Sequence, residues 1–316
     1  MREKNLVICD EEIRYADSLG ENISRHEELS VKVYVCSNLE NAIQLSKEKQ
    51  IHIFVVDEKY AYEERRKVPA NHIFILGRSK IADLQEEEHA LLKYRCADEI
   101  IRELFEVYTE KTKDDLFDIS KKESAKILSV YSPIHRVGKT EFAIALSREC
   151  AKRKKTLYIN LEEYAGFEGA DENGGNLGDL LYYMKQGNEN LGMRLQAIVS
   201  QRDGVDYLLP IPMALDLKEI SKNEWIGLLE QIRENSIYEC VVLDVGESVQ
   251  GLYSLLERCD RVYMPVLQDA ISERKIKRYE SNVERLGLTR LPNISYRFVM
   301  PENINDYAKI RAKEEC

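Results

Sequence analysis

Residues 132–140, SPIHRVGKT, lie between an apolar run and an amphipathic run, and this arrangement restricts the fold more than any other feature of the chain. The apolar run, residues 127–131, is typical of a buried strand, and residues 141–146 are typical of a helix. A strand that passes through a Gly-Lys-Thr loop into a helix is the setting of a phosphate-binding loop, because loop N–H groups and the helix N-terminus then face the phosphates. The sequence therefore predicts an α/β unit that binds a phosphorylated ligand.

The loop keeps the end of this motif and lacks its glycine-rich beginning. The spacing G-x-x-x-x-G-K-[S/T] runs from Pro133 to Thr140, so a proline, which has no backbone N–H, stands at the first glycine position. Gly138 allows close approach of a phosphate, Lys139 can reach β- and γ-phosphate oxygens, and Thr140 can bind Mg²⁺. A bare Gly-Lys-Thr can also be a surface turn with a solvated lysine, but the flanking strand and helix favour the phosphate-binding loop.

Length and composition narrow the class of protein. At 316 residues the chain is long enough for two hydrophobic cores. It has no apolar run of 18 residues and no signal-peptide pattern at its start, so we expect a cytoplasmic protein. Seven cysteines stand without C-x-x-C spacing, so we expect reduced thiols and not metal ligands. The net charge of −10 argues against a general attraction to nucleic acid or anionic lipid.

Two domains are predicted on either side of a charged segment. Residues 111–124 are dense in charge and lack apolar periodicity, so we place a linker there, between domains at 1–110 and 125–316. In both domains apolar runs alternate with amphipathic stretches, which is the pattern of βαβ units with parallel sheets. The runs before the linker, which predict a flavodoxin-like (βα)5 sandwich, are residues 6–9, 31–36, 51–57, 73–77 and 90–93.

Charged side chains follow three of these N-terminal strands. Asp10 and Glu11 follow the first strand, Asp57 ends the third, and Lys93 ends the fifth. In an open parallel sheet, ligands bind at the carboxyl ends of the strands. This half resembles a response-regulator receiver domain over nearly its full length. The resemblance implies that Asp10 and Glu11 bind Mg²⁺. It also implies that Asp57 accepts a phosphoryl group and that Lys93 contacts that group.

Two departures from the receiver pattern weaken the case for signalling. Gly77 stands where receivers have a switch hydroxyl, and Tyr94 stands where they have a proline after the lysine. Without that hydroxyl, phosphorylation has no side chain to draw inward. We therefore favour a degenerate, atypical receiver domain that serves for docking.

A second acidic position belongs to the C-terminal half. Residues 238–247 are an apolar run that ends in Asp244 and continues to Gly246. A carboxylate at a strand end can hold Mg²⁺ through water, and a glycine two residues later can turn its N–H toward a γ-phosphate. An aspartate at a strand end is often only a cap or loop residue. Its pairing with the Gly-Lys-Thr loop favours Asp244 as the Walker B acid.

The loop together with Asp244 resembles the ParA/MinD class of P-loop ATPases. Combined with the receiver-like half, the whole chain resembles the CpaE/TadZ branch, the pilus-assembly localisation factors. The resemblance includes residues 207–217 and 259–266, and it implies a ParA/MinD-like domain with a mostly parallel sheet and helices on both faces. The strand and loop at 297–303 match those that contact adenine in the class, which implies this role for Met300 and Pro301.

The chain departs from this class at two places. Ile134 stands at the position of the signature lysine, which in the class reaches the partner's nucleotide. Arg136 could supply a positive charge to phosphate from the same or the other subunit, or it could be a solvated loop charge. The strand end that usually carries two aspartates has Asn160 and Glu162, and misplacement of the attacking water by about 1 Å can cost 10²-fold in rate. We therefore expect ATP binding with slow or absent hydrolysis.

The resemblance implies ATP and Mg²⁺ as cofactors and a homodimer that positions a Flp/Tad-type pilus secretion apparatus, with recruitment to a cell pole or membrane machinery. The alternative is a response-regulator-like or nucleotide-independent scaffold that acts through the N-terminal domain. The catalytic candidates are Lys139, Glu162 and Asp244, and the metal candidates are Thr140 and Asp244. The residues that we expect to bind nucleotide, some of them also named above, are Arg136, Val137, Gly138, Lys139, Thr140, Glu141, Gly246, Met300 and Pro301.

Three further segments carry weaker signals. Residues 273–278, ERKIKR, could form a basic DNA-binding face, but with the negative net charge a solvated helix face is favoured. Residues 171–178 are rich in glycine but do not join a strand to a lysine-bearing helix, so we expect a flexible connection. The helix at 305–312 lacks the apolar face of a membrane-targeting helix, and direct membrane insertion is not expected.

Overall fold

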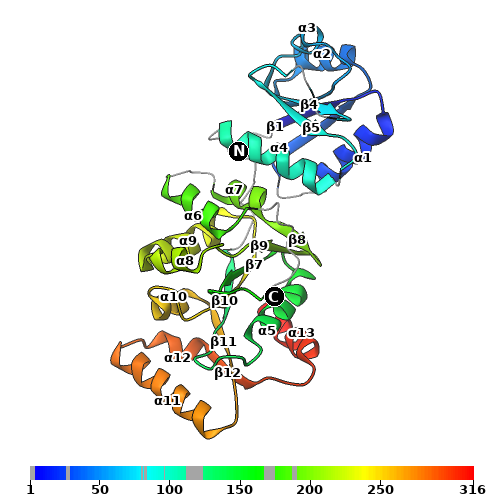
Figure 1. Ribbon diagram of the computed structural model, residues 1–316. Coiled ribbons are helices and arrows are strands. Elements are labelled where there is room, and N and C mark those ends of the chain that lie inside the picture. The colour runs from blue at the N-terminus through cyan, green and yellow to red at the C-terminus, as the bar shows by residue number, and fades with distance from the viewer. Residues whose placement is uncertain are drawn as a thin grey trace. The chain divides into compact units, whose positions relative to one another are not determined.

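The computed structural model describes residues 4–25, 29–79, 81, 84–95, 97–111, 124–166, 175–186 and 191–316. The chain divides into two compact units, Met1–Lys121 and Lys122–Cys316, and each is described here by itself (Figure 1). The predicted linker at 111–124 lies outside the described residues except for its two end residues.

The first unit holds a five-stranded sheet in which every neighbouring pair of strands is parallel. The order β2-β1-β3-β4-β5 is a doubly wound order, with its switch point between β1 and β3. The small parallel N-terminal sheet predicted from the apolar runs is therefore confirmed. Its elements are β1 (Lys4–Cys9), α1 (Ile13–Ser24), β2 (Val31–Cys36), α2 (Leu39–Glu48), β3 (Ile51–Asp57), α3 (Tyr62–Arg65), β4 (Ala70–Gly77), β5 (Glu88–Leu92) and α4 (Ala97–Lys111).

The second unit holds a seven-stranded sheet in the order β12-β11-β6-β10-β7-β9-β8. It is mostly parallel, as predicted, and the β8–β9 pair is antiparallel. The strand of the phosphate loop, β6, lies between β10 and β11, so Asp244 comes to the same edge as the loop. The strands are β6 (Lys126–Val130), β7 (Thr156–Leu161), β8 (Ser200–Arg202), β9 (Val205–Leu208), β10 (Cys240–Val245), β11 (Arg261–Val266) and β12 (Ser295–Val299).

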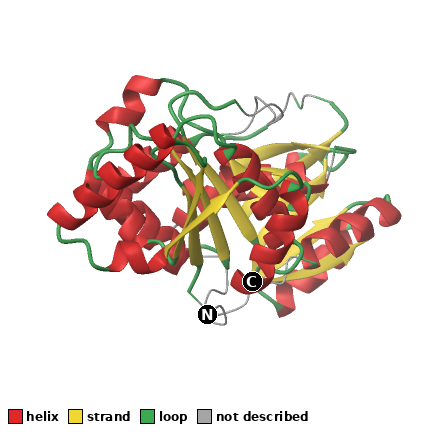
Figure 2. Ribbon diagram, turned by 90° about the horizontal axis from the view of Figure 1, so that it is seen from below, coloured by secondary structure: helices red, strands yellow, loops and turns green. Residues whose placement is uncertain are grey.

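Helices flank the strands on both sides (Figure 2). Phe142 of the first of them, α5, packs its ring 4.9 Å from that of Phe298 in β12 and 5.8 Å from that of Tyr307 in α13. Burial of such aromatic side chains fixes α5, and with it the loop that precedes it, against the sheet. The helices are α5 (Lys139–Ala151), α6 (Leu177–Lys185), α7 (Leu191–Ile198), α8 (Ala214–Glu219), α9 (Lys222–Asn235), α10 (Leu252–Arg258), α11 (Ala270–Arg285), α12 (Arg290–Ile294) and α13 (Ile304–Glu315).

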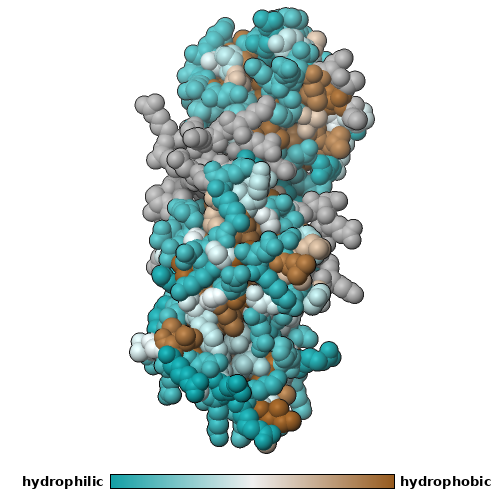
Figure 3. Space-filling view, turned by 60° about the vertical axis from the view of Figure 1, so that its left-hand side comes forward, coloured by the Kyte–Doolittle hydropathy of each residue, from teal (hydrophilic) through white to brown (hydrophobic). Residues whose placement is uncertain are grey.

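The glycine-rich segment at 171–178 leads into α6. Residues 171–174 lie outside the described residues, and Asn176 caps α6 by accepting a hydrogen bond from the Gly178 N–H at 2.7 Å. The face drawn in Figure 3 is mostly hydrophilic, with hydrophobic residues in small separate groups. Within the described ranges, no helix is both long enough and apolar enough to cross a bilayer.

Candidate functional site

The predicted strand, loop and helix are present around the Gly-Lys-Thr sequence. β6 ends at Val130, α5 begins at Lys139, and Gly138 caps the helix with φ of 79°. This left-handed conformation is open to glycine at little cost. A Cβ at Gly138 would also lie 3.0 Å from Cε of Met300. The structure thus brings Met300 to the loop, and a larger residue at position 138 would require the Met300 side chain to shift.

The residues before Gly138 divide into buried and exposed positions. Ile134 and Val137 are buried, whereas His135 and Arg136 are exposed. Arg136 adopts φ of 56°, an uncommon conformation for a residue with a side chain. Ile134, at the position of the signature lysine of the ParA/MinD class, is therefore part of the core. The exposed positive charge of the loop is Arg136, two residues later.

Lys139 turns back onto the neighbouring strand ends. Its side chain is buried, and Nζ donates a hydrogen bond to the Val245 carbonyl oxygen at 3.1 Å. The same Nζ lies 2.5 Å from Oε1 of Glu162. Two of the three predicted catalytic residues therefore contact each other, and the carboxylate of Glu162 neutralises the lysine.

Thr140 and Asp244 form the second contact of the site. Thr140 Oγ1 donates to Oδ2 of Asp244 at 2.6 Å, and the hydroxyl of Tyr158 lies 3.2 Å from the same oxygen. Asp244 is fully buried, and its Oδ1 has no hydrogen-bond partner among the described residues. Burial raises the pKa of Asp244 to about 6, the negative charge of Glu162 adds to this rise, and the hydrogen bond from Thr140 opposes it.

The predicted metal candidates fit Mg²⁺. Mg²⁺ prefers oxygen ligands, and the hydroxyl of Thr140 and the carboxylate of Asp244 supply them from two different elements. A buried carboxylate oxygen without a partner is costly in the absence of a positive charge. A bound cation would remove that cost.

Asn160 supports this arrangement in a way that an aspartate could not. Its Nδ2 donates to the Tyr158 hydroxyl at 3.2 Å, and its Oδ1 accepts from the Glu162 N–H at 2.8 Å. The amide thus links the residue that contacts Asp244 to the residue that contacts Lys139. The asparagine, which stands where a carboxylate is usual, therefore holds Tyr158 and Glu162 in position.

Gly246 lies against the end of β7. Its N–H donates to the Leu161 carbonyl oxygen at 3.3 Å, and a Cβ at this position would lie 2.8 Å from that oxygen. The close approach explains the glycine. The contact with a γ-phosphate that we predicted for this N–H would require the bond to Leu161 to open.

Two further residues of the predicted binding set are not buried. Glu141 is exposed in the first turn of α5, and Pro301 is half-buried next to Met300. A cavity of about 400 Å³ lies beside the loop and is lined by Pro133, His135 and Glu247 together with Lys275 and Arg278 of α11. The basic segment at 273–278 therefore contributes two side chains beside the loop, which its sequence alone did not indicate.

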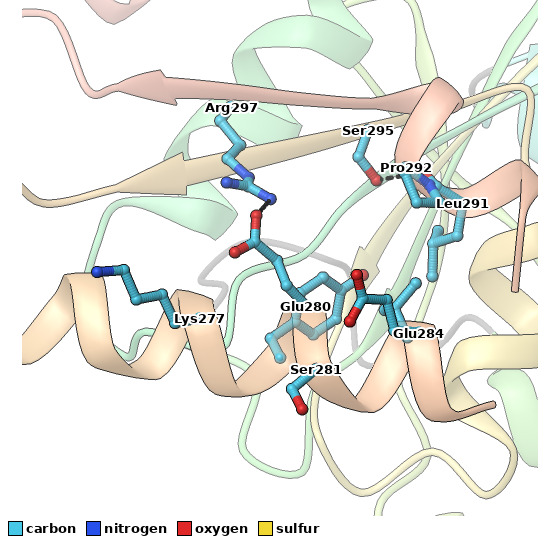
Figure 4. Close-up of a pocket in the computed structure, with 10 residues that line it drawn as sticks. Lys277, Glu280, Ser281, Glu284, Leu291, Pro292, Ser295 and Arg297 are labelled. Atoms are coloured by element: carbon cyan, nitrogen blue, oxygen red, sulfur yellow. Dashed lines mark hydrogen bonds and ion pairs between the residues drawn. The ribbon is translucent and has the colours of Figure 1, made fainter. Parts of the chain in front are cut away.

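A second cavity, of about 470 Å³, lies between α11 and β12. Figure 4 shows Arg297 reaching toward Glu280, with Leu291 and Pro292 at the other end. It contains none of the predicted nucleotide-binding residues. The site by the loop is therefore identified by its polar groups and not by its volume.

The charged cluster of the first unit forms at the carboxyl ends of β1, β3 and β5. Lys93 Nζ lies 2.6 Å from Oδ2 of Asp10 and is hydrogen-bonded to Asp57. Burial raises the pKa of Asp10, against the opposing effect of Lys93. Burial lowers the pKa of Lys93, but its bonds to Asp10 and Asp57 outweigh this effect and raise it above its ordinary value.

The acids beside Asp10 differ from the prediction. Glu11 is exposed and pairs with Lys59, whereas Glu12 lies 3.5 Å from Lys93 Nζ. Hydrogen bonds from Tyr94, at 2.7 Å, and from Arg78 lower the pKa of Glu12 to about 2. The structure therefore brings Glu12, and not Glu11, to the cluster. Two adjacent glutamates cannot be told apart from sequence, because the turn after β1 decides which of them points inward.

Gly77 lacks the space for the missing switch residue. A Cβ there would lie 2.7 Å from Cγ1 of Ile81 and 2.8 Å from Oε2 of Glu58. A hydroxyl-bearing side chain would require both neighbours to move. This crowding agrees with the absence of a switch hydroxyl at this position.

Comparisons with known proteins concern the fold. No protein-family model matches the sequence, and no curated protein matches it. The chain is similar to a putative plasmid partition protein from Borrelia burgdorferi bound to AMPPNP, with 17% identity, coverage of 61% of this chain and 84% of the other, and a TM-score of 0.44. A ParA family ATPase from Chlorobium tepidum is 13% identical over 56% of this chain and 74% of its own, with a TM-score of 0.46. The MinC:MinD cell division protein complex from Aquifex aeolicus is 17% identical over 55% of this chain and 68% of its own, with a TM-score of 0.40. At these scores the function has to be argued from the residues of the site.

Proposed function

We propose that this chain is an ATP·Mg²⁺-dependent, dimerising localisation factor of the CpaE/TadZ type, which positions a Flp/Tad-type pilus secretion apparatus. The observation that carries the nucleotide part is the pair Thr140–Asp244, whose buried Oδ1 has no partner among the described residues. It lies at the edge of the sheet where the phosphate loop enters α5. The pilus part rests on the resemblance of the sequence.

Binding would proceed by exchange of partners at Lys139. Phosphate oxygens would compete with the carboxylate of Glu162 for Nζ, while Gly138 allows backbone approach and the N-terminus of α5 favours the negative charge. Thr140 and Asp244 would hold Mg²⁺, which neutralises charge on the phosphates. The release of Glu162 from Lys139 gives the site two arrangements, one with nucleotide and one without.

Hydrolysis is proposed to be slow or absent. Asn160 is committed to Tyr158 and to the Glu162 N–H, and an amide cannot act as a general base. Glu162, once released from Lys139, is longer by one methylene than the aspartate usual at this strand end, which would misplace it relative to an attacking water. The site therefore favours retention of ATP over turnover.

Exposed apolar side chains support self-association. Tyr182, Met213 and Leu215 are all more than half exposed. Tyr182 also lines a hollow of about 380 Å³ together with Ile211 and Pro212. Contiguous apolar surface marks interaction sites, and the hollow lined by Tyr182, Ile211 and Pro212 is our candidate surface for self-association. A nucleotide that favours the dimer would shift the population toward it.

Replacing Glu162 with glutamine is expected to tighten ATP·Mg²⁺ binding about tenfold, which is about 1.4 kcal/mol. The amide keeps the shape of the side chain but no longer neutralises Lys139, so phosphate meets less competition. Isothermal titration calorimetry of the full chain measures this. Glu163→Gln is the matched control, because the adjacent carboxylate pairs with Lys218 and not with Lys139. Equal or weaker binding by the Glu162 variant would contradict the exchange.

A second candidate function, phosphosignalling, is favoured by the contact of Lys93 with Asp10 and Asp57. We nevertheless expect no labelling of Asp57 by acetyl phosphate, because the acids that could complete a Mg²⁺ site are held by other groups. Glu11 pairs with Lys59, and Glu12 pairs with Arg78. Mass spectrometry of the treated protein tests this. Labelling that is lost in Asp57→Asn and kept in Asp17→Asn would establish this second function.

A further inference from the structure

Three cysteines that are far apart in the sequence converge in the core of the second unit. The sulfur atoms of Cys150, Cys240 and Cys316 all lie within 4.8 Å of one another. The distance between these three residues along the sequence does not indicate that they lie together. Within the described ranges, no other group of three or more His, Cys, Asp or Glu residues places its ligand atoms this close together.

Each cysteine comes from a different element. Cys150 lies in the last turn of α5, Cys240 is the first residue of β10, and Cys316 follows α13. Figure 1 shows α5 and α13 side by side. The cluster thus lies at the ends of α5 and β10 remote from Lys139 and Asp244. It is separate from the proposed nucleotide site.

The spacing of the sulfurs suits a single metal ion. An ion about 2.3 Å from each of three sulfurs places the sulfurs about 3.8–4.0 Å from one another. The three sulfurs lie within 4.8 Å of one another, so small rotations of the cysteine side chains would bring them to that spacing. Cys150 and Cys240 are buried and Cys316 is half-buried, so the third thiol gives an entry path for the ion.

Two lysines stand near the half-buried thiol of the cluster. Lys126 and Lys154 supply positive charge near Cys316. Nζ of Lys126 also lies 2.6 Å from Oε2 of Glu315. The thiolate is the form of cysteine that binds metals.

We propose that Cys150, Cys240 and Cys316 form a three-thiolate site for a thiophilic d¹⁰ metal ion, Zn²⁺ or Cu⁺. Soft thiolate ligands select these ions over Mg²⁺, so the site does not compete with Thr140 and Asp244 for their metal. A bound ion would tie α5, β10 and α13 together. It would thereby stabilise the second unit, since a ligand that binds only the folded state adds to stability.

The test uses the full chain, stripped of metal and kept reduced under anaerobic conditions. One arm receives Zn²⁺, one receives Cu⁺, and a third receives Cd²⁺ as a probe whose thiolate charge-transfer absorption reports sulfur ligation. We expect one ion per chain in at least one of the first two arms and in the Cd²⁺ arm. We also expect Cys150, Cys240 and Cys316 to be protected from alkylation, as mapped by mass spectrometry.

Two variants make the test specific. Cys316→Ser is expected to lose more affinity than the roughly 10–100-fold that removal of an outer-shell partner costs. Cys259→Ser is the matched control, because this buried cysteine of the same unit lies outside the cluster. Circular dichroism shows whether each variant folds. The proposal is overturned by failure of the reduced parent to bind either Zn²⁺ or Cu⁺, whether or not it binds Cd²⁺. It is equally overturned by binding that survives in Cys316→Ser, or by a disulfide within the cluster that forms under these conditions in place of metal binding.

Discussion

Replacing Lys139 with alanine is expected to abolish stabilisation of the chain by ATP·Mg²⁺. For the parent, nucleotide at about 100 times its dissociation constant should add about 2.7 kcal/mol to the free energy of unfolding. The variant should show no such gain, because Lys139 is the buried cation at the loop and its removal leaves Glu162 to face the phosphates unpaired. Thermal unfolding of the second unit with and without ATP·Mg²⁺ measures the difference.

The control for this experiment is Lys152→Ala. Lys152 follows the same helix, is exposed and pairs only locally, with Glu149 at 2.5 Å. It should keep the full nucleotide-dependent gain. A gain of the same size in Lys139→Ala would contradict the assignment of the loop, and a gain lost in both variants would point to a general effect of charge.

Replacing Asp244 with asparagine is expected to have opposite effects with and without nucleotide. In Mg²⁺-free buffer at pH 7 the variant should be more stable than the parent by up to about 3 kcal/mol, which is the cost of a buried carboxylate whose pKa is about 6 in place of 3.8. In the presence of Mg²⁺, ATP should bind the variant much more weakly, because one of the two proposed metal ligands is lost. Urea unfolding and calorimetry measure the two effects.

The pH dependence of this stability difference has a defined sign. A carboxyl group with a raised pKa in the folded state favours folding fully when it is protonated in both states, below about pH 4. That contribution is lost as pH rises through about 6. The advantage of Asp244→Asn should therefore be small at pH 4 and largest above pH 6, whereas exposed Asp216→Asn should show no such rise. A difference that is independent of pH would contradict the burial account.

Local sequence patterns were sufficient to predict the strands and the loop that carry the site. The apolar run before residue 132, the Gly-Lys-Thr loop and the run ending at Asp244 each carry their own pattern, and β6 and β10 do pair. Parallel pairing places Asp244 beside Val130 and Asn160, which brings the loop and the acid to one edge. Periodicity predicts such strands because it reports which residues are buried along a single element.

The contacts between elements could not be predicted in the same way. The pairing of Lys139 with Glu162 and the inward position of Ile134 depend on how the loop packs against β7 and β10. The inward position of Glu12 is set by the turn after β1. Cys150, Cys240 and Cys316 carry no local spacing signal, so their convergence follows only from the packing of α5, β10 and α13.

The central claim is that ATP·Mg²⁺ binds at Gly138, Lys139, Thr140 and Asp244 and favours a dimer. Light scattering coupled to size exclusion, on the full chain with and without ATP·Mg²⁺, tests it most directly. The account predicts that nucleotide doubles the molar mass of the parent and leaves that of Lys139→Ala unchanged. An unchanged mass for the parent, with no nucleotide retained in its peak, would contradict it.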